Sequence, residues 1–376
     1  MRNKVERANT QRQVVAMSAR KIANKRNSTW CNVRRHLMVW MTTSIALSGC
    51  FQPDTMTETF TDYQRKVASI QERPLLAPPE TSLVLLPGKR DMLQAIPVTT
   101  LGIVDTYQLR QCQLFGIIAE RNSSLGKVQD AFRNFDYQIQ LIEGLERCIG
   151  SSQIDSALKQ DLQVILGIKY RYLSKHFYNL LFTSDAMRTQ LNSSGWLEPT
   201  SGSVTMKVKP SLLALNDITE SIAQLESDGV LMPFPPFIMP FQETLEKNPV
   251  IGNLAYSLQA STQWLDAVTR QLSQYDSAIV CGEHRDTTRF NYLVNVFNQV
   301  FIAKIQPYLS FLDSEYRVVS GELRFIEAAS KYNKADSVYD VRALYHQFSL
   351  SNREHVNYWQ ALFSRCGKTL RDVRNH

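Results

Sequence analysis

Apolar side chains recur every three or four residues along most of this chain, which is the spacing that places them on one face of an α-helix. The pattern is clearest in two runs, at 125–149 and 254–279. The first run contains Leu125, Val128, Phe132, Phe135, Ile139, Ile142, Leu145 and Ile149, and the second contains Leu254, Leu258, Leu265, Val268, Leu272, Tyr275 and Ile279, interrupted by Ser261. Because each apolar face needs other helices to cover it, the pattern predicts a helical bundle.

Further helices are expected where the same period continues, at about 57–72, 101–120, 155–187, 211–226, 285–312 and 338–366. The chain has 15 glycines in 376 residues, and so low a content agrees with few strands and tight turns. We therefore predict an all-α fold, with one domain at 50–376 built as a bundle of roughly seven or eight helices. Pro307 is expected to kink or end the helix in which it lies.

Two proline-rich stretches break the helical period and are expected to be extended connectors. The first, 73–97, holds five prolines and has room for a short strand at 82–86. The second, 232–241, combines four prolines with three phenylalanines, so we expect it to cover the protein's own core. The alternative for this stretch is a loop that docks a partner or faces a membrane. A weak alternation at 195–209 leaves room for a small hairpin.

The segment before Cys50 has the features of an export signal. Arg34, Arg35 and His36 precede an apolar run of 11 residues, 37–47, which is shorter than the about 20 residues needed to span a bilayer. Leu47-Ser48-Gly49-Cys50 then resembles a bacterial lipobox, in which the cysteine is acylated and becomes the mature N-terminus. The alternative is a soluble protein whose early helix happens to end in Gly-Cys.

We expect residues 1–49 to be a removable leader and Cys50 to anchor the body to a membrane, because several acyl chains give lasting attachment. The polar stretch before the export signal is long for a signal peptide, so we expect synthesis to begin near Val33. Phe51, rather than Asp, follows the cysteine, and by resemblance to lipoprotein sorting rules this favours the outer membrane. The protein would then face the periplasm from the cell envelope.

The net charge of +7 belongs to the leader, which carries 10 of the 42 Lys and Arg but one of the 35 Asp and Glu. The remaining chain has 32 basic and 34 acidic residues. A body so close to neutral gives no reason to expect a nucleic-acid partner.

Four cysteines follow Cys50, namely Cys112, Cys148, Cys281 and Cys366, and an even number in an oxidising compartment predicts two disulfides. Pairing neighbours along the chain, Cys112 with Cys148 and Cys281 with Cys366, closes the shorter loops and is our first choice of three. If two straight helices joined by a turn near 122–124 carried the first pair, those cysteines would lie about 20 Å apart. That pairing therefore needs a longer turn or a broken helix. Free thiols are the alternative, and the wide spacing disfavours zinc.

Motifs that would identify an enzyme are incomplete or missing. Ser124-Leu125-Gly126-Lys127 fits the S-x-x-K pattern of cell-wall acyl enzymes, but its companion motifs are absent. Gly367-Lys368-Thr369 lacks the earlier glycine of a phosphate-binding loop. The few histidines are scattered and are expected at the surface or as caps. The sequence thus predicts no catalytic residues, metal or cofactor, and leans against an enzyme.

The densest polar cluster lies around a predicted turn between two helices and consists of Arg110, Glu120, Arg121, Asn122, Ser123, Ser124 and Lys127. Serine hydroxyls and cations at the start of a helix could bind an anion or a partner. The simpler interpretation is a capped, salt-bridged turn, in which Ser123 or Ser124 starts the second helix.

Three strings resemble one uncharacterised family of bacterial lipoproteins, catalogued as domain of unknown function 3080. The most specific joins Leu109-Arg110-Gln111-Cys112 to the string from Ile118 to Val128, IAERNSSLGKV. Asn295-Val296-Phe297 with Ile305-Gln306-Pro307-Tyr308-Leu309, and Trp359-Gln360-Ala361-Leu362 with Cys366-Gly367, support it. The resemblance implies an exported, lipid-anchored protein with paired cysteines and no assigned activity, so it supplies no catalytic residues. The long polar leader departs from the family's short signal peptide.

These observations together predict a non-enzymatic envelope lipoprotein that binds a protein or a cell-wall partner. The alternative is an envelope enzyme or small-ligand binder that uses the polar cluster between Arg110 and Lys127. The two differ in whether those side chains converge on a closed pocket or lie flat on a turn.

Overall fold

The computed structural model describes residues 55–98, 108–124, 126–128, 130–282, 284–330 and 339–369. The chain divides after Asp54 into two units, and every described residue belongs to the second, Thr55–His376. The leader, the lipobox-like sequence and Cys50 lie outside the described residues, as does the first part of the helix expected at 101–120.

The described part of the chain is helical, with no β-strand, so the predicted all-α class is confirmed. Seven long helical segments are present in it, close to the predicted number: α2 (Thr55–Gln71), α6 (Ala131–Gly150), α7 (Ser156–Thr183), α9 (Thr205–Asp228), α11 (Ile251–Gln274), the continuous run of α12 (Thr288–Val296), η4 (Phe297–Ile305) and α13 (Gln306–Val319), and α15 (Val341–Arg365). The shorter elements are α3 (Lys89–Met92), α5 (Leu114–Asn122), η1 (Gly126–Val128), α8 (Asp185–Leu191), η2 (Met239–Phe241), α10 (Gln242–Lys247), η3 (Asp276–Ala278), η5 (Ser320–Glu322) and α14 (Arg324–Ser330).

Several expected boundaries were wrong, each for a local reason. The helix expected at 155–187 ends at Thr183, because the Ser184 side chain accepts a hydrogen bond from Met187 N and starts α8. The helix expected at 101–120 is interrupted by a turn at 109–113. Gln113 has the left-handed conformation (φ 66°), and α5 begins at the next residue. Helix α9 begins at Thr205, six residues before the expected start. The hairpin considered at 195–209 is reduced to a single bridge between Thr200 and Gly202.

Pro307 does not end its helix, contrary to one of our two expectations. It lies at the start of α13, directly after the π-helical element η4, and the helix continues to Val319. The hydrogen-bond register changes between η4 and α13, and a proline without an N–H is tolerated at the first turn of the new register.

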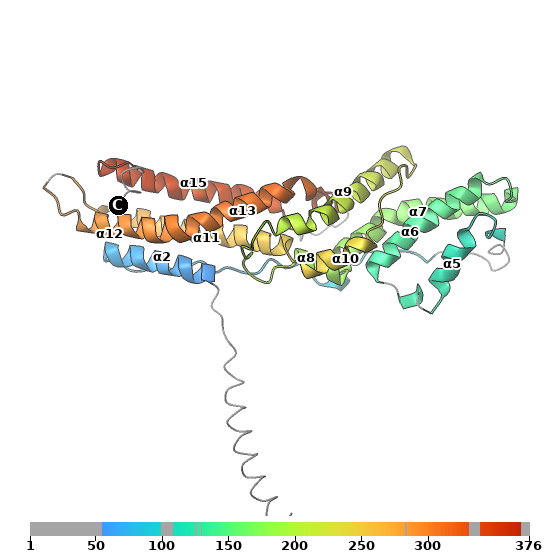
Figure 1. Cartoon of the computed structure of the whole chain (residues 1–376), viewed down its shortest axis with the longest axis horizontal. Coiled ribbons are helices and arrows are strands. Elements are labelled where there is room, and N and C mark those ends of the chain that lie inside the picture. The colour runs from blue at the N-terminus through green and yellow to red at the C-terminus, as the bar shows by residue number, and fades with distance from the viewer. Residues whose placement is uncertain are drawn as a thin grey trace, which may run out of the picture. The chain divides into compact units, whose positions relative to one another are not determined.

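The buried apolar residues form two cores. The larger one spans most of the helices, including α2, α11 and α15, and Figure 1 shows α11 lying between α2 and α15. The smaller one gathers α5, the second half of α6 and the start of α7, and consists of Leu109, Cys112, Leu114, Leu141, Leu145, Cys148, Ile154, Leu158 and Leu162. Part of the chain therefore has a core of its own.

The first proline-rich connector is extended, with α3 as its one helical turn, but contains no strand at 82–86. Polar side chains that follow α8 take the place of a partner strand. Val84 N donates to Ser193 Oγ (2.7 Å), Ser193 N donates to Val84 O (2.8 Å), and Leu86 N donates to Asn192 Oδ1 (2.7 Å). These bonds hold the connector against the bundle.

The second connector is held in a similar way by Asp136 of α6. The two oxygens of its carboxylate accept hydrogen bonds from Ile238 N (2.8 Å) and Met239 N (3.0 Å). Ile238 and Pro235 are buried, whereas Met232, Phe237 and Met239 are exposed. This connector covers the protein's own core with one side and presents apolar side chains with the other.

None of the helices in the described ranges combines the length and the apolar character needed to cross a bilayer.

Candidate functional site

The polar cluster predicted around Ser123 lies at the end of α5 and is tied together by its own hydrogen bonds. Ser123 Oγ donates to Glu120 O (2.7 Å) and accepts from Gly126 N (3.0 Å), and Lys127 N donates to Ser123 O (3.1 Å). The chain folds this closely because Gly126 lacks a side chain. A Cβ added there would lie 2.1 Å from Glu120 O.

Arg121 binds the two ends of this turn together. Its guanidinium donates to Gly126 O and to Asn134 Oδ1 (3.2 Å) and lies over the ring of Tyr137, 5.5 Å from the centroid. Arg110 covers the ring of Phe115 at 4.5 Å. The side chains of Arg110, Glu120, Asn122, Ser123, Ser124 and Lys127 are exposed.

The expected helix start at Ser123 or Ser124 is wrong. Ser123 follows the last residue of α5, and the cap of α6 is Asp130, whose carboxylate accepts from Arg133 N (2.9 Å). The cluster therefore lies at the carbonyl end of a helix, which carries partial negative charge, rather than at an anion-binding N–H end. Its geometry is that of a braced turn.

Both disulfides form in the predicted pairing. Cys112 is bonded to Cys148 with the Cα atoms 5.1 Å apart, and Cys281 to Cys366 with the Cα atoms 5.3 Å apart. The pairing was expected to need a longer turn or a broken helix, and the structure has both. The helix is broken before α5, and the turn from Ser123 to Asp130 is long, so Cys112 comes opposite the last turns of α6.

A groove of about 650 Å³ lies between η4, α13 and α15, and sequence reasoning missed it. Its apolar lining is Phe297, Phe301, Ile302, Leu309, Phe348 and Val356, and its polar lining is Gln306, Ser310, Asp313, Arg317, Tyr345, Ser349, Asn352 and Arg353. The volume is in the range of ligand sites, and π-helical segments such as η4 are frequent at functional sites. No sequence motif marks a π-helix, so nothing in the sequence indicated this groove.

The charged groups of the groove are mostly paired with one another. Asp313 forms an ion pair with Arg317 (2.9 Å) and accepts a hydrogen bond from Tyr345. Burial and this bond raise the pKa of Tyr345, so its phenol stays protonated near neutral pH. Arg353 is exposed and has no ion-pair partner in the described part of the chain. The groove thus offers an apolar floor, a polar rim and one available cation.

A buried histidine lies behind the apolar floor, contrary to the expectation of surface or capping histidines. His355 is fully buried and accepts or donates hydrogen bonds at both ring nitrogens, to Tyr63 Oη (3.0 Å) and Thr269 Oγ1 (2.8 Å). Trp359 Nε1 donates to Tyr63 Oη (3.0 Å), and the Phe301 ring packs against the imidazole at 4.7 Å. Burial lowers the pKa of His355 to about 3, so the ring is neutral at physiological pH.

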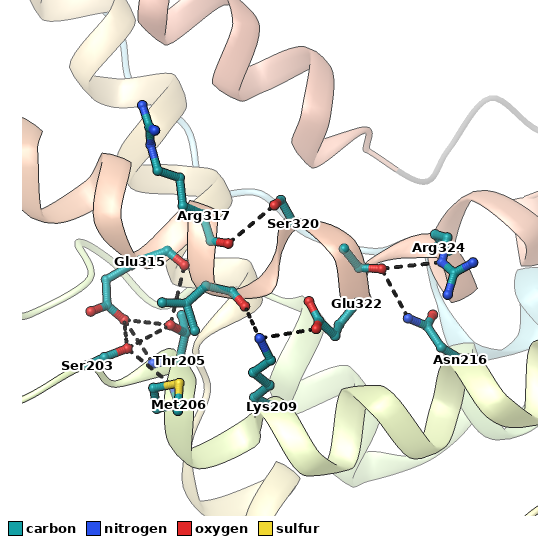
Figure 2. A network of polar contacts seen from close by, with 12 residues as sticks. Ser203, Thr205, Met206, Lys209, Asn216, Glu315, Arg317, Ser320, Glu322 and Arg324 are labelled. Carbon is teal, nitrogen blue, oxygen red and sulfur yellow. Dashed lines mark hydrogen bonds and ion pairs between the residues drawn. The ribbon is translucent and has the colours of Figure 1, made fainter.

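Glu315 is a second buried ionisable group that a search for catalytic residues would single out. Figure 2 shows that its carboxylate is already satisfied: Ser203 Oγ (3.0 Å), Thr205 N (2.9 Å) and Thr205 Oγ1 (2.8 Å) all donate to Oε2. In the same view Lys209 Nζ donates to Val318 O (3.0 Å) and pairs with Glu322 (3.2 Å). The network joins the start of α9 to α13 and η5, so its role is structural.

No group of three or more His, Cys, Asp and Glu side chains in the described ranges is close enough to hold a metal ion.

Comparison with protein-family models gives one match, to the family described as a protein of unknown function, DUF3080, over residues 60–370. The chain belongs to the DUF3080 family. The match covers both disulfides, the braced turn and the groove, so the DUF3080 domain comprises nearly all of the described helices. Neither the curated proteins nor the solved structures contain a match to this DUF3080 chain.

Proposed function

We propose that this protein is a lipid-anchored lipoprotein of the bacterial envelope, attached through Cys50, facing the periplasm from the outer membrane, and acting as a binding protein rather than an enzyme. The observation that carries the proposal is the pair of disulfides in a body that directly follows a lipobox-like sequence. Disulfides form and persist mainly in oxidising compartments, which include the periplasm. The apolar run at 37–47 and Cys50 supply the export signal and the anchor.

The groove between η4, α13 and α15 is the surface that we propose for the partner. Its apolar floor suits the burial of a partner's apolar side chains, and Arg353 with Asn352 and Gln306 suits peptide groups and a carboxylate at the rim. The polar cluster from Arg110 to Lys127 gives less support to the alternative of an enzyme or small-ligand binder. Its central donors and acceptors are used within the turn.

The anchor is tested by the intact mass of the protein extracted from membranes, measured before and after reduction and alkylation. We expect an acylated chain that begins at Cys50 and gains four alkyl groups only after reduction, while a Cys50→Ala variant loses the acyl mass and the membrane fraction. A full-length chain with free thiols would contradict the proposal.

The groove is tested by crosslinking in intact envelopes with two charge-reversal variants. Arg353→Glu should lose the crosslinked species that the wild type forms, because it removes the available cation at the rim. Arg171→Glu, an exposed arginine on α7, is the matched control and should retain that species. Equal crosslinking by both variants would contradict a partner site in the groove.

A further inference from the structure

The first connector presents leucines to solvent in a regular pattern. Between residues 83 and 86 the side chains alternate, with Val84 and Leu86 buried (8% and 6% exposed) and Leu83 and Leu85 facing out (47% and 59%). The alternation follows from the extended backbone, which turns successive side chains to opposite sides. The bonds of Val84 to Ser193 and of Leu86 to Asn192 fix which side faces inward.

The outward leucines belong to a concentration of exposed apolar side chains in one connector. Of the 14 large apolar residues exposed in the described part, five lie between residues 75 and 98: Leu75, Leu83, Leu85, Leu93 and Val98. Single exposed apolar residues are ordinary, but Leu83 and Leu85 lie on the same side of the extended chain, where together they form a small apolar surface.

The middle of this connector lies close to the start of α2. Trp196, three residues after the Ser193 that holds Val84, donates from Nε1 to Thr57 Oγ1 (3.0 Å) and stacks on Phe60 with ring centroids 6.1 Å apart. Trp196 also packs against Tyr256 at 5.6 Å, and the Tyr256 hydroxyl donates to Thr81 of the connector (3.5 Å). In Figure 1 the connector passes the N-terminal end of α2 on its way to α8.

Chain length then limits how far this region can be from the lipid. Five residue steps separate Cys50 from Thr55, the first residue of α2, and they span at most about 18 Å when fully extended. An acylated Cys50 therefore keeps the start of α2, and with it the outward leucines, within reach of the bilayer surface.

We infer that Leu83 and Leu85 form a second membrane contact, inserting into the interfacial layer of the bilayer beside the acyl anchor. The inference rests on the proposed lipid attachment at Cys50 and adds an orientation to it. This apolar surface therefore contacts the lipid bilayer to which Cys50 is anchored, and not another protein.

Tryptophan fluorescence of the full acylated protein in liposomes tests this contact. The tryptophans that follow Cys50 are buried (Trp196 8%, Trp264 2% and Trp359 0% exposed), so quenching by lipid would act on an added, exposed tryptophan. We expect Leu85→Trp to lose about half of its added emission when phosphatidylethanolamine and phosphatidylglycerol carry brominated tails, because an interfacial indole contacts the lipid. Leu83→Trp is a second, independent reporter of the same surface.

Val164→Trp is the matched control, because Val164 is 65% exposed on α7, outside this connector, and should show no quenching. If the protein is acylated by mass and neither leucine position is quenched more than the control, the membrane contact is overturned. A protein that lacks the acyl mass overturns the anchor as well, and the mass measurement identifies that case separately.

Discussion

The imidazole of His355 bonds to Tyr63 of α2 and to Thr269 of α11, and Trp359 of its own helix donates from Nε1 both to the imidazole (3.1 Å) and to that tyrosine. Neutral imidazole is the form that this enclosure favours, because burial lowers its pKa to about 3 from an ordinary value near 6.5. The unfolded chain therefore binds a proton at higher pH than the folded one.

Replacing His355 should reveal this difference. Because the pKa of His355 is lower in the folded state, the contribution of the neutral ring to the free energy of unfolding is fully present above about pH 6.5. It decreases by about 1.4 kcal/mol per pH unit as the pH falls toward 3. In His355→Gln, the free energy of unfolding should depend less steeply on pH between about pH 6 and pH 5, by the equivalent of one proton. At pH 7 the substitution should lower the free energy of unfolding by about 1–3 kcal/mol. Urea unfolding at several pH values measures both.

His346→Gln is the control for that experiment, because His346 is exposed on the same helix. His176, whose pKa burial lowers to about 4, contributes a slope of the same sign and remains in both variants. An unchanged slope in His355→Gln would show that the buried ring is not neutral.

At this scale the sequence predicted little of the candidate site. It identified Arg121 and Ser123 as members of one cluster but not their bonds to Gly126 and Asn134, since these depend on how closely the chain approaches itself in the turn. His355 gave no signal, because its partners Tyr63 and Thr269 are distant in sequence and only the packed helices bring them together.

At the scale of elements, the two proline-rich connectors show how a helical protein can hold extended chain without strands. Each is held by side chains rather than by a ladder: Ser193 and Asn192 bind the first and Asp136 the second. Removing one such side chain should release a segment without unfolding the helices beside it.

Asp136→Ala should free the second connector from α6. Ile238 N and Met239 N would lose their acceptor, which costs about 1–3 kcal/mol for a buried pair of donors. We expect faster hydrogen exchange and proteolysis within 232–241, measured by mass spectrometry. Asp161→Ala, an exposed position on α7, should leave both unchanged, and equal effects in the two variants would refute the anchoring role.

The periodic helices were the most predictable elements, because one apolar face suffices to define them; α2 and α15 begin and end within a few residues of expectation. The errors came where a single polar side chain or a turn overrides the period, as Ser184 does between α7 and α8. The continuation through Pro307 was unpredictable for another reason, since the π-helical segment before it packs against α2, which is distant in sequence.

On the scale of the whole described body, the two disulfides serve different cores. Cys112–Cys148 lies inside the smaller core, whereas Cys281–Cys366 joins the segment before α12 to the end of α15, at the edge of the larger core. The loops that they close have sequence separations of 36 and 85 residues. Removal of each disulfide should therefore loosen a different part of the protein.

Cys281→Ser with Cys366→Ser should lower the global unfolding free energy by about 4–5 kcal/mol, the loop-closure contribution for that separation. Cys112→Ser with Cys148→Ser should act locally, with faster hydrogen exchange in 108–122 and in the end of α6 but little change in the main urea transition. Exchange followed during urea unfolding compares the pairs. Identical exchange patterns would argue for one cooperative core.

Helix α15 contributes Trp359 and His355 to the same cluster as Tyr63 of α2, and it also carries the residues that precede Cys366. Tyr63 and Trp359 are separated by 296 positions, so the earliest described helix finds its hydrogen-bond partners in the latest. The parts of α2 and α11 that pack against α15 therefore stay uncovered until this last helix is in place. A chain that ended before residue 341 would lack the helix that closes the larger core, and it would expose apolar surface and leave Cys281 without its disulfide partner.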